Sequence, residues 1–215
     1  MKVLYTVLLG LLCTFDIRAD FQAGLRAYRS GNFTAAYKQW KPIAERGDAN
    51  AQYNLALLYE RGQGVRRDLT QAALWYRKSA EQGAAAAQCT LGNMYDLGEG
   101  VPKDYDEAMT WYRKAAGQGH APAEVNLAIL YYNAQGTKRD LVTAYAWLSR
   151  AAAAHEPRAA WLLRTTASRM SSRQIKKAQH LAGKWKPQPV MIAQTVPTKA
   201  FPEPGKRLSS TLSHK

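Results

Sequence analysis

Apolar side chains recur at helical spacing in two stretches of residues 85–120, and a short polar stretch separates the two. Each set falls on one face of a helix, because the first has the spacing i, i+4, i+7, i+8 and the second the spacing i, i+3, i+4, i+7. The first set is Ala87, Leu91, Met94 and Tyr95, and the second is Ala108, Trp111, Tyr112 and Ala115. Residues 98–103 between them hold two glycines and a proline, which cannot continue either helix. The pattern therefore predicts a hairpin of two α-helices.

The same pattern returns without gaps 36 residues earlier and 36 residues later. The matching sets include Leu55, Leu91 and Leu127; Tyr59, Tyr95 and Tyr131; Gly64, Gly100 and Gly136; Asp68, Asp104 and Asp140; Trp75, Trp111 and Trp147. One hairpin cannot bury such an apolar face alone, so neighbouring units have to stack. We therefore expect an all-α stack of hairpins with units at residues 49–84, 85–120 and 121–156.

Residues that begin and end helices stand at the expected places in each unit. Asp104 is predicted to be the N-cap of the second helix of the central unit. Glu107 follows three residues later, as in a capping box, and Gly119 stands where a left-handed residue ends a helix. The third unit departs from the pattern at Ala134, Thr137, Leu148 and His155, where the other two carry Gly, Val, Tyr and Gly. Its loop therefore lacks the first of the two glycines that favour the turn and keeps the second, Gly136.

These repeated residues resemble those of the Sel1-like repeat, a subfamily of the tetratricopeptide-type α/α repeats. The resemblance is carried by Leu91-Gly92, Tyr95, Gly98-x-Gly100-Val101, Asp104, Ala108, Trp111-Tyr112 and Lys114-Ala115-Ala116. It implies a right-handed α/α solenoid in which the first helices of the hairpins line a concave surface. It also implies an adaptor that binds a protein or a peptide.

The chain begins with a segment that differs from the repeats. Residues 1–19 join Lys2 to an apolar run from Val3 to Phe15, which is typical of a secretory signal peptide. The run is shorter than the roughly 20 apolar residues that cross a membrane, so cleavage is favoured over a permanent anchor. We expect export to the periplasm or the medium, with a mature chain that starts near Asp20 and has no transmembrane span.

The segments on either side of the repeats complete the predicted organisation. Residues 20–48 predict an N-terminal capping hairpin, and residues 157–185 predict C-terminal capping helices. Residues 186–215 are basic and rich in proline without a helical period, and we interpret them as a disordered tail.

Positive charge gathers at the C-terminal end. The formal net charge is +14, and residues 157–215 hold twelve Lys and Arg residues against one acid. The candidate basic surface is Arg173, Lys176, Lys177 and Lys184. It is either a solvated helix cap or a surface that docks on anionic lipid or acidic cell-wall polymer. Nucleic acid is an unlikely partner, because the signal segment predicts export.

Sequence patterns that carry catalysis are missing. The chain has no G-x-S-x-G, H-E-x-x-H or Walker pattern, and its histidines do not cluster with carboxylates at metal-ligand spacing. Cleavage would leave Cys89 as the single cysteine, which we interpret as a small helix residue. The G-x-G loops follow no strand, so we interpret them as turns and not as phosphate loops. We expect no catalytic residue, no metal and no cofactor.

The outward positions of the first helices are the candidates for partner binding. They mix amides, a hydroxyl and an acid with apolar side chains, which suits an extended peptide. The candidate groove residues are Tyr53, Asn54, Leu57, Thr90, Asn93, Asp96, Asn126, Ile129 and Tyr132. The alternative is that the apolar members simply pack against neighbouring units.

The sequence thus predicts an exported, non-enzymatic scaffold that mediates protein–protein or protein–peptide binding through a concave helical surface. One alternative is envelope docking through the basic C-terminus. The other is a β-lactamase-like or penicillin-binding activity, as in some secreted relatives of the resembled family. This chain offers neither the disulfides of those relatives nor a nucleophile–base pair.

Overall fold

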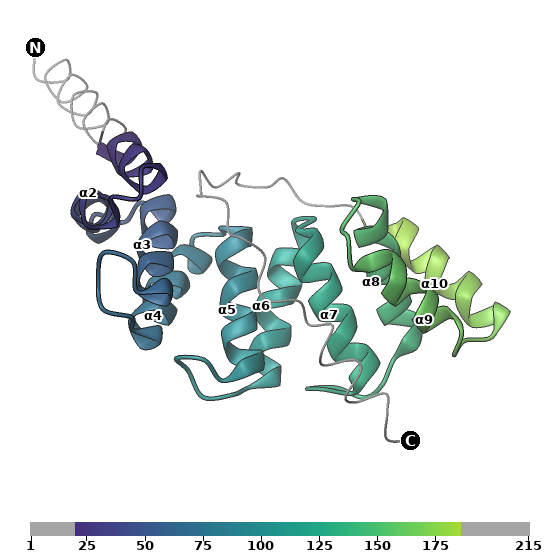
Figure 1. Ribbon diagram of the computed structural model, residues 1–215. Helices are drawn as coiled ribbons and strands as arrows, with labels where there is room; N and C mark the ends of the chain where they lie inside the picture. The colour runs from purple at the N-terminus through teal and green to yellow at the C-terminus, as the bar shows by residue number, and fades with distance from the viewer. Residues whose placement is uncertain (1–19, 186–215) are drawn as a thin grey trace, which may run out of the picture.

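The computed structural model describes residues 20–185, which lie in α-helices and in the turns that join them (Figure 1). Residues 20–29 are the described part of the first helix, and the labelled helices follow from α2. Their bounds are α2 Phe33–Glu45, α3 Ala49–Arg61, α4 Leu69–Glu81, α5 Ala85–Leu97, α6 Tyr105–Gly117, α7 Ala121–Asn133, α8 Leu141–Ala153, α9 Ala159–Ala167 and α10 Ser172–Lys184. The expected signal peptide of residues 1–19 and the expected tail of residues 186–215 lie outside the described residues.

The helices pair into hairpins that follow one another in an elongated row (Figure 1). Within units, α3 packs on α4, α5 on α6 and α7 on α8. Between units, α4 contacts α5 and α6 contacts α7, while α2 covers α3 at one end and α9 and α10 both pack on α8 at the other. The prediction of an all-α solenoid is confirmed. In residues 20–185, none of the helices is long and apolar enough to cross a membrane.

The repeated small and aromatic residues build the core of each hairpin. In the central unit Ala108, Tyr112 and Ala115 are fully buried, and Trp111 is 4% exposed. The alanines let the helix backbones approach, and the rings fill the space beside them. The Lys114 ammonium lies 4.0 Å from the centroid of the Trp111 ring, a cation–π contact at its outer edge.

Helix ends follow the sequence closely, with one correction. Asp104 caps α6 as predicted, because its carboxylate accepts from the backbone N–H groups of Asp106 and Glu107. The reciprocal bond of the expected capping box is not made. The Glu107 carboxylate instead accepts from the indole N–H of Trp111 at 3.0 Å, one helical turn further on. At α10 a capping box does form between Ser171 and Gln174.

The second glycine of each G-x-G loop lies against the backbone of the preceding unit. Gly100 has a φ of +72°, and a Cβ atom placed there would lie 2.2 Å from the carbonyl oxygen of Leu69. Gly136 approaches Tyr105 in the same way one unit later. The loops are therefore turns, as predicted. They also require close backbone approach, and this contact fixes the spacing between hairpins.

The third unit keeps the geometry of the other two despite its different residues. Ala134 ends α7 with a φ of 60°, and His155 follows α8 with a φ of 58°. These are the positions at which the sister units carry glycine. A left-handed residue with a Cβ costs roughly 1–2 kcal/mol, so the packing of the neighbouring helices imposes this conformation.

The C-terminal helix α9 continues the register of the first helices, and both α9 and α10 pack on α8. Ala159 on α9 stands 36 residues after Ala123 on α7, and both are fully buried. Residues 168–171 then connect α9 to α10, a shorter connection than residues 134–140 of the third unit. Trp185 closes this end by stacking on Trp147 with ring centroids 3.9 Å apart.

Candidate functional site

The first-helix face is the surface formed by the outward positions of α3, α5, α7 and α9. Four of the predicted groove residues are partly exposed there, namely Asn93, Asp96, Asn126 and Ile129. The other five are buried, namely Tyr53, Asn54, Leu57, Thr90 and Tyr132. The Tyr53 ring, for example, packs edge-on against Tyr76 of α4 with centroids 5.2 Å apart. Five side chains are thus covered by neighbouring helices, which corrects the prediction that all nine line an open groove.

A hydrogen-bonded row of polar side chains crosses the exposed part of this face. The Asn93 Oδ1 atom accepts from the Tyr112 hydroxyl at 2.6 Å and from the Asn126 amide at 2.7 Å. Asn126 Oδ1 in turn accepts from Arg158 at 3.1 Å, and Arg158 also pairs with Glu156 at 2.9 Å. Burial raises the pKa of Tyr112 well above its usual value, so its hydroxyl stays a donor. The row joins three successive units and fixes both amides.

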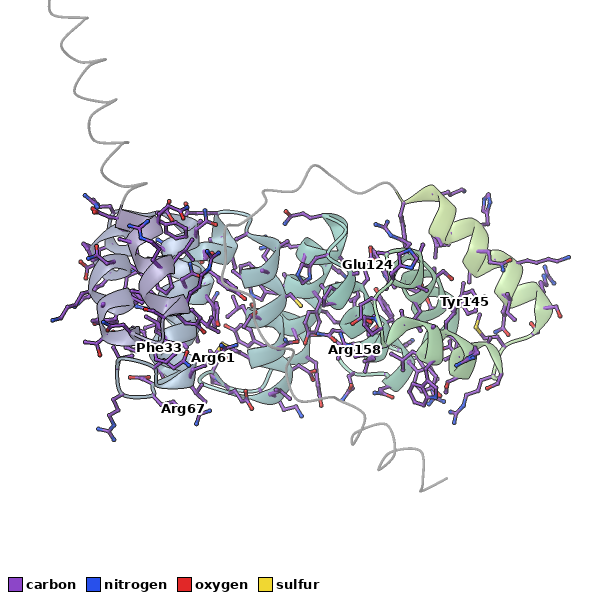
Figure 2. All side chains as sticks on the ribbon, turned by 45° about the horizontal axis from the view of Figure 1, so that its top comes forward. Phe33, Arg61, Arg67, Glu124, Tyr145 and Arg158 are labelled. Atoms are coloured by element: carbon purple, nitrogen blue, oxygen red, sulfur yellow. The ribbon has the colours of Figure 1, made fainter. Side chains whose placement is uncertain are left out.

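In the third unit a buried ion pair takes the place of a glutamine-to-backbone hydrogen bond found in the first two units. Gln52 and Gln88 donate to the backbone carbonyls of Ala44 and Ala80, respectively. The matching residue of the third unit is Glu124, which is 2% exposed and lies 2.9 Å from Arg150. Burial raises the pKa of Glu124, and the Arg150 charge opposes that rise. Figure 2 shows Glu124 and Arg158 near the C-terminal helices, whereas Phe33 and the α3–α4 region lie at the opposite end.

A small pocket opens where α7, α8 and α9 meet. Its lining includes Ile129 and Tyr132 from α7, Leu148 from α8, and Leu162, Thr165 and Thr166 from α9. Tyr132 is 6% exposed, and its hydroxyl is buried without a hydrogen-bond partner among the described residues. Ile129 and Thr165 are partly exposed and stand at the same position of successive units. The pocket therefore belongs to the first-helix face.

Two arginines that the sequence reasoning missed lie over the ring of Tyr132. The guanidinium groups of Arg139 and Arg169 lie 5.7 Å and 5.4 Å from the centroid of the Tyr132 ring. Trp161 is 47% exposed on α9, one helical turn before Thr165. Extending the 36-residue register past the third unit would have found Trp161, because it follows Tyr53, Cys89 and Val125 in that register. No sequence signal brings the two arginines together.

The predicted basic surface lies on α10. Its members are exposed and form no ion pair with any described residue, namely Arg173, Lys176, Lys177 and Lys184. Their charge is therefore not neutralised locally. Binding by this surface stays a prediction.

The described part of the chain offers few groups suited to catalysis or metal binding. Residues 20–185 contain no group of three or more His, Cys, Asp or Glu side chains placed to hold a metal ion. Burial raises the pKa of the Cys89 thiol to about 12, so it is not a thiolate nucleophile near neutral pH. Burial lowers the pKa of His120, the N-cap of α7, to about 4.

The stacked hairpins define the class of the protein as an α/α-solenoid repeat protein. The repeats are Sel1 repeats, because residues 49–83, 85–120 and 121–155 each match the family model described as Sel1 repeat. The resemblance stated from the sequence is thereby confirmed. Sel1 repeats are generally a scaffold fold that typically mediates protein–protein interaction.

Solved structures with this fold extend the likeness beyond the three repeats. A protective antigen present in uropathogenic Escherichia coli strains, which displays an SLR fold, superposes with a TM-score of 0.72 and 32% identity. The match covers 79% of this chain and 37% of the antigen. A Sel1 repeat protein from Oxalobacter formigenes has a TM-score of 0.63 and 35% identity, covering 66% of this chain and 59% of that one.

Curated relatives match over a shorter stretch. The DAP3-binding cell death enhancer 1 of Rattus norvegicus is 41% identical over 51 residues, and that of Mus musculus is 41% identical over 49 residues. These stretches are 24% and 23% of this chain but 10% of each relative. The chain therefore spans about a tenth of the curated relatives that it matches.

Proposed function

We propose that this protein is an exported, non-enzymatic adaptor that binds a protein or peptide partner on its first-helix face. Sel1 repeats typically mediate protein–protein contacts, and related structures carry the same stacked hairpins. The observation that carries the proposal is the row from Asn93 through Asn126 to Arg158. Its amides are partly exposed and already held by hydrogen bonds, so a partner need not order them on binding.

Photo-crosslinking from this face tests the proposal. A photo-reactive residue at Asn93 should capture a defined partner from an extract of the source organism, while the same residue at Thr110, exposed on α6, should not. In the otherwise native chain, Asn93→Ala with Asn126→Ala should abolish partner recovery and leave the helical circular dichroism signal unchanged. Thr110→Ala with Gln179→Ala removes two exposed polar groups from second helices and serves as the matched control. Equal capture from Asn93 and Thr110 would move the site off this face.

Export rests on the pattern of residues 1–19 alone. The expected mature chain begins near Asp20. Mass spectrometry of protein recovered from the periplasm or the medium measures its first residue. Recovery of the full chain from the cytoplasm alone would contradict export.

A second candidate function is docking on an anionic envelope surface. It is favoured by four exposed cations, Arg173, Lys176, Lys177 and Lys184, for which the described residues offer no acidic partner. Attraction of this kind weakens as the Debye length falls from about 10 Å at 0.1 M salt to about 3 Å at 1 M. Binding to anionic vesicles should fall steeply with salt and with Lys176→Glu plus Lys177→Glu. If vesicle binding is unchanged by this charge reversal, docking through α10 is excluded.

A further inference from the structure

Helix α9 keeps the register of the first helices, but no second helix packs along it. In each repeat the first helix packs on its own second helix, α3 on α4, α5 on α6 and α7 on α8. Helix α10 has the 13 residues of those second helices, yet it packs on α8 and not along α9. Within the described residues no further first helix follows α9 either. One side of α9 therefore lacks the helix that covers it elsewhere in the stack.

The open side of α9 consists of Trp161, Arg164 and Ser168, which lie on one face of the helix and are all exposed. The counterparts of Trp161 in the three repeats are at most 5% exposed, namely Tyr53, Cys89 and Val125. The counterparts of Arg164 are all buried, namely Ala56, Gly92 and Ala128. The register thus identifies this side as one that the complete units keep covered.

Contacts in the first two units show what a second helix brings to this side. Tyr76 of α4 packs edge-on against Tyr53 with ring centroids 5.2 Å apart, and its hydroxyl donates to the Glu60 carboxylate at 2.6 Å. In the next unit the Tyr112 ring of α6 lies against Gly92, where an added Cβ atom would be 2.6 Å from the ring. The open side of α9 is therefore the place at which a second helix would present an aromatic ring.

The charge on α10 explains why it does not take this place. Arg164 stands where the repeats have alanine or glycine, so a helix packed on α9 has to accommodate a cation. The charged residues of α10 are all basic, namely Arg173, Lys176, Lys177 and Lys184. Like charges repel, and α10 packs on α8 instead. The described acids from residue 121 onward are engaged elsewhere, namely Glu124, Asp140 and Glu156. The open side thus favours a helix that brings its own carboxylates.

The remaining part of the chain does not supply such a helix. Residues 186–215 carry five Lys and Arg residues against one acid, the same sign as Arg164. Their five prolines leave no run longer than eleven residues, and proline breaks a helix interior. A second copy that used the same side would bring Arg164 against Arg164. A partner of opposite charge fits better than either.

We propose that the open side of α9 binds an acidic amphipathic helix of the partner, which takes the place of the missing second helix. This contact rests on the adaptor function proposed above and names one segment that the partner contributes. The partner helix lays an aromatic or large apolar side chain on Trp161, as Tyr76 lies against Tyr53, and pairs a carboxylate with Arg164.

The test measures fluorescence anisotropy of helix-stapled peptides bound to the full chain, because a free helix of this length is marginal in water. The first peptide has the sequence of residues 104–117, which is α6 with its N-cap, and carries Arg113→Glu and Lys114→Glu. The second has lysine in place of its five acids, the third adds Tyr112→Ser to the first, and the fourth has the sequence of residues 171–185. We expect saturable binding of the first peptide alone. Equal binding of the lysine peptide, or tighter binding of the fourth, would overturn the proposal.

Matched apolar variants of the protein locate the site. Trp161→Ala should weaken binding of the first peptide by about tenfold or more, because aromatic anchors dominate such interfaces. Leu74→Ala removes a side chain of similar exposure from α4 and should change the affinity by less than about twofold. Both residues are about half exposed, so neither change should alter the melting temperature appreciably. Equal losses in the two variants would remove Trp161 from the site.

Charge reversal gives a second, independent signature. Arg164→Glu should weaken the first peptide by about tenfold or more and strengthen the lysine peptide, since it exchanges the sign of the pairing group. Arg173→Glu makes the same change in net charge on α10 and should act only through long-range attraction that salt removes. If the two reversals act alike at 0.5 M salt, roughly a 4 Å Debye length, the attraction is diffuse and the contact at Arg164 is refuted.

Two further measurements separate the possible occupants and the two proposals. Sedimentation of the full chain should show no dimer that Trp161→Ala dissociates, and such a dimer would identify a second copy as the occupant and overturn the partner helix. Crosslinking from Asn93 reads the adaptor function separately. If Asn93 captures a partner while none of the peptides binds, the adaptor function stands and the helix site on α9 is wrong.

Discussion

Replacing Gly100 by alanine measures the contact that holds successive hairpins together. The added methyl group would lie 2.2 Å from the Leu69 carbonyl oxygen and 2.9 Å from the Leu69 Cβ atom. Both distances are far inside van der Waals contact, and the first obstacle is backbone, which cannot rotate away as a side chain can. The loop and α4 therefore have to separate, and the joint between the first two units has to loosen.

The magnitude combines three contributions. The φ of +72° at Gly100 costs an alanine roughly 1–2 kcal/mol. Relieving the overlap with Leu69 adds on the order of 1–3 kcal/mol, as for other overpacked sites. Alanine restricts the unfolded chain and returns about 0.4–1 kcal/mol. We expect Gly100→Ala to lower the free energy of unfolding by about 2–4 kcal/mol.

Two other glycines separate these contributions. Gly31 has a φ of +79° but no atom within 4 Å of an added Cβ, so Gly31→Ala carries the backbone strain alone and should cost about 1 kcal/mol. Gly117 lies in α6 with nothing within 4 Å, so Gly117→Ala should stabilise by about 0.5–1 kcal/mol. Urea unfolding followed by circular dichroism measures all three. If Gly100→Ala is no worse than Gly31→Ala, the close approach of loop and backbone is refuted.

Two further predictions concern the core and the N-cap of α7. Trp111→Ala should lower the free energy of unfolding by roughly 3–5 kcal/mol by leaving a cavity, whereas Leu74→Ala at a half-exposed position should have little effect in the same urea assay. A Trp111→Ala melting temperature near that of the original chain would contradict its burial. Burial lowers the pKa of His120 from 6.5 to about 4, so folding favours the neutral ring and protonation destabilises the fold. The free energy of unfolding should fall by roughly 3 kcal/mol as the pH drops from 6.5 to 4, and the same pH series on His120→Gln should lack that part of the fall.

The helices were predictable because the same pattern of apolar, capping and loop residues recurs in every unit. Asp104, Gly100 and Trp111 each have counterparts 36 residues away, so a chance match to one helical pattern is excluded. The role of Glu107 was not predictable from spacing. Its position fits both a capping box and an i, i+4 contact with Trp111, and the indole N–H wins in the folded hairpin. The choice between these two hydrogen bonds depends on the side-chain geometry of the folded hairpin, which residue spacing does not specify.

The sequence predicted which residues share a position on the first-helix face, but it did not predict which of them are exposed. The repeat places Tyr53, Cys89, Val125 and Trp161 at one position, and the first three are buried while Trp161 is 47% exposed. The difference follows from position in the stack, because no further first helix follows α9 within the described residues.

Contacts between residues far apart in the sequence were a second feature that the repeat pattern did not predict. Arg139 and Arg169 are 30 residues apart and lie outside the helical pattern, yet the turns that carry them bring both guanidinium groups to the ring of Tyr132. A repeating sequence describes the middle of a solenoid best, where each unit has two similar neighbours. Within the described residues no further first helix follows α9, so side chains that a neighbour covers in the repeats are exposed there. Trp161 is therefore exposed at this end, whereas its three counterparts in the repeats are buried.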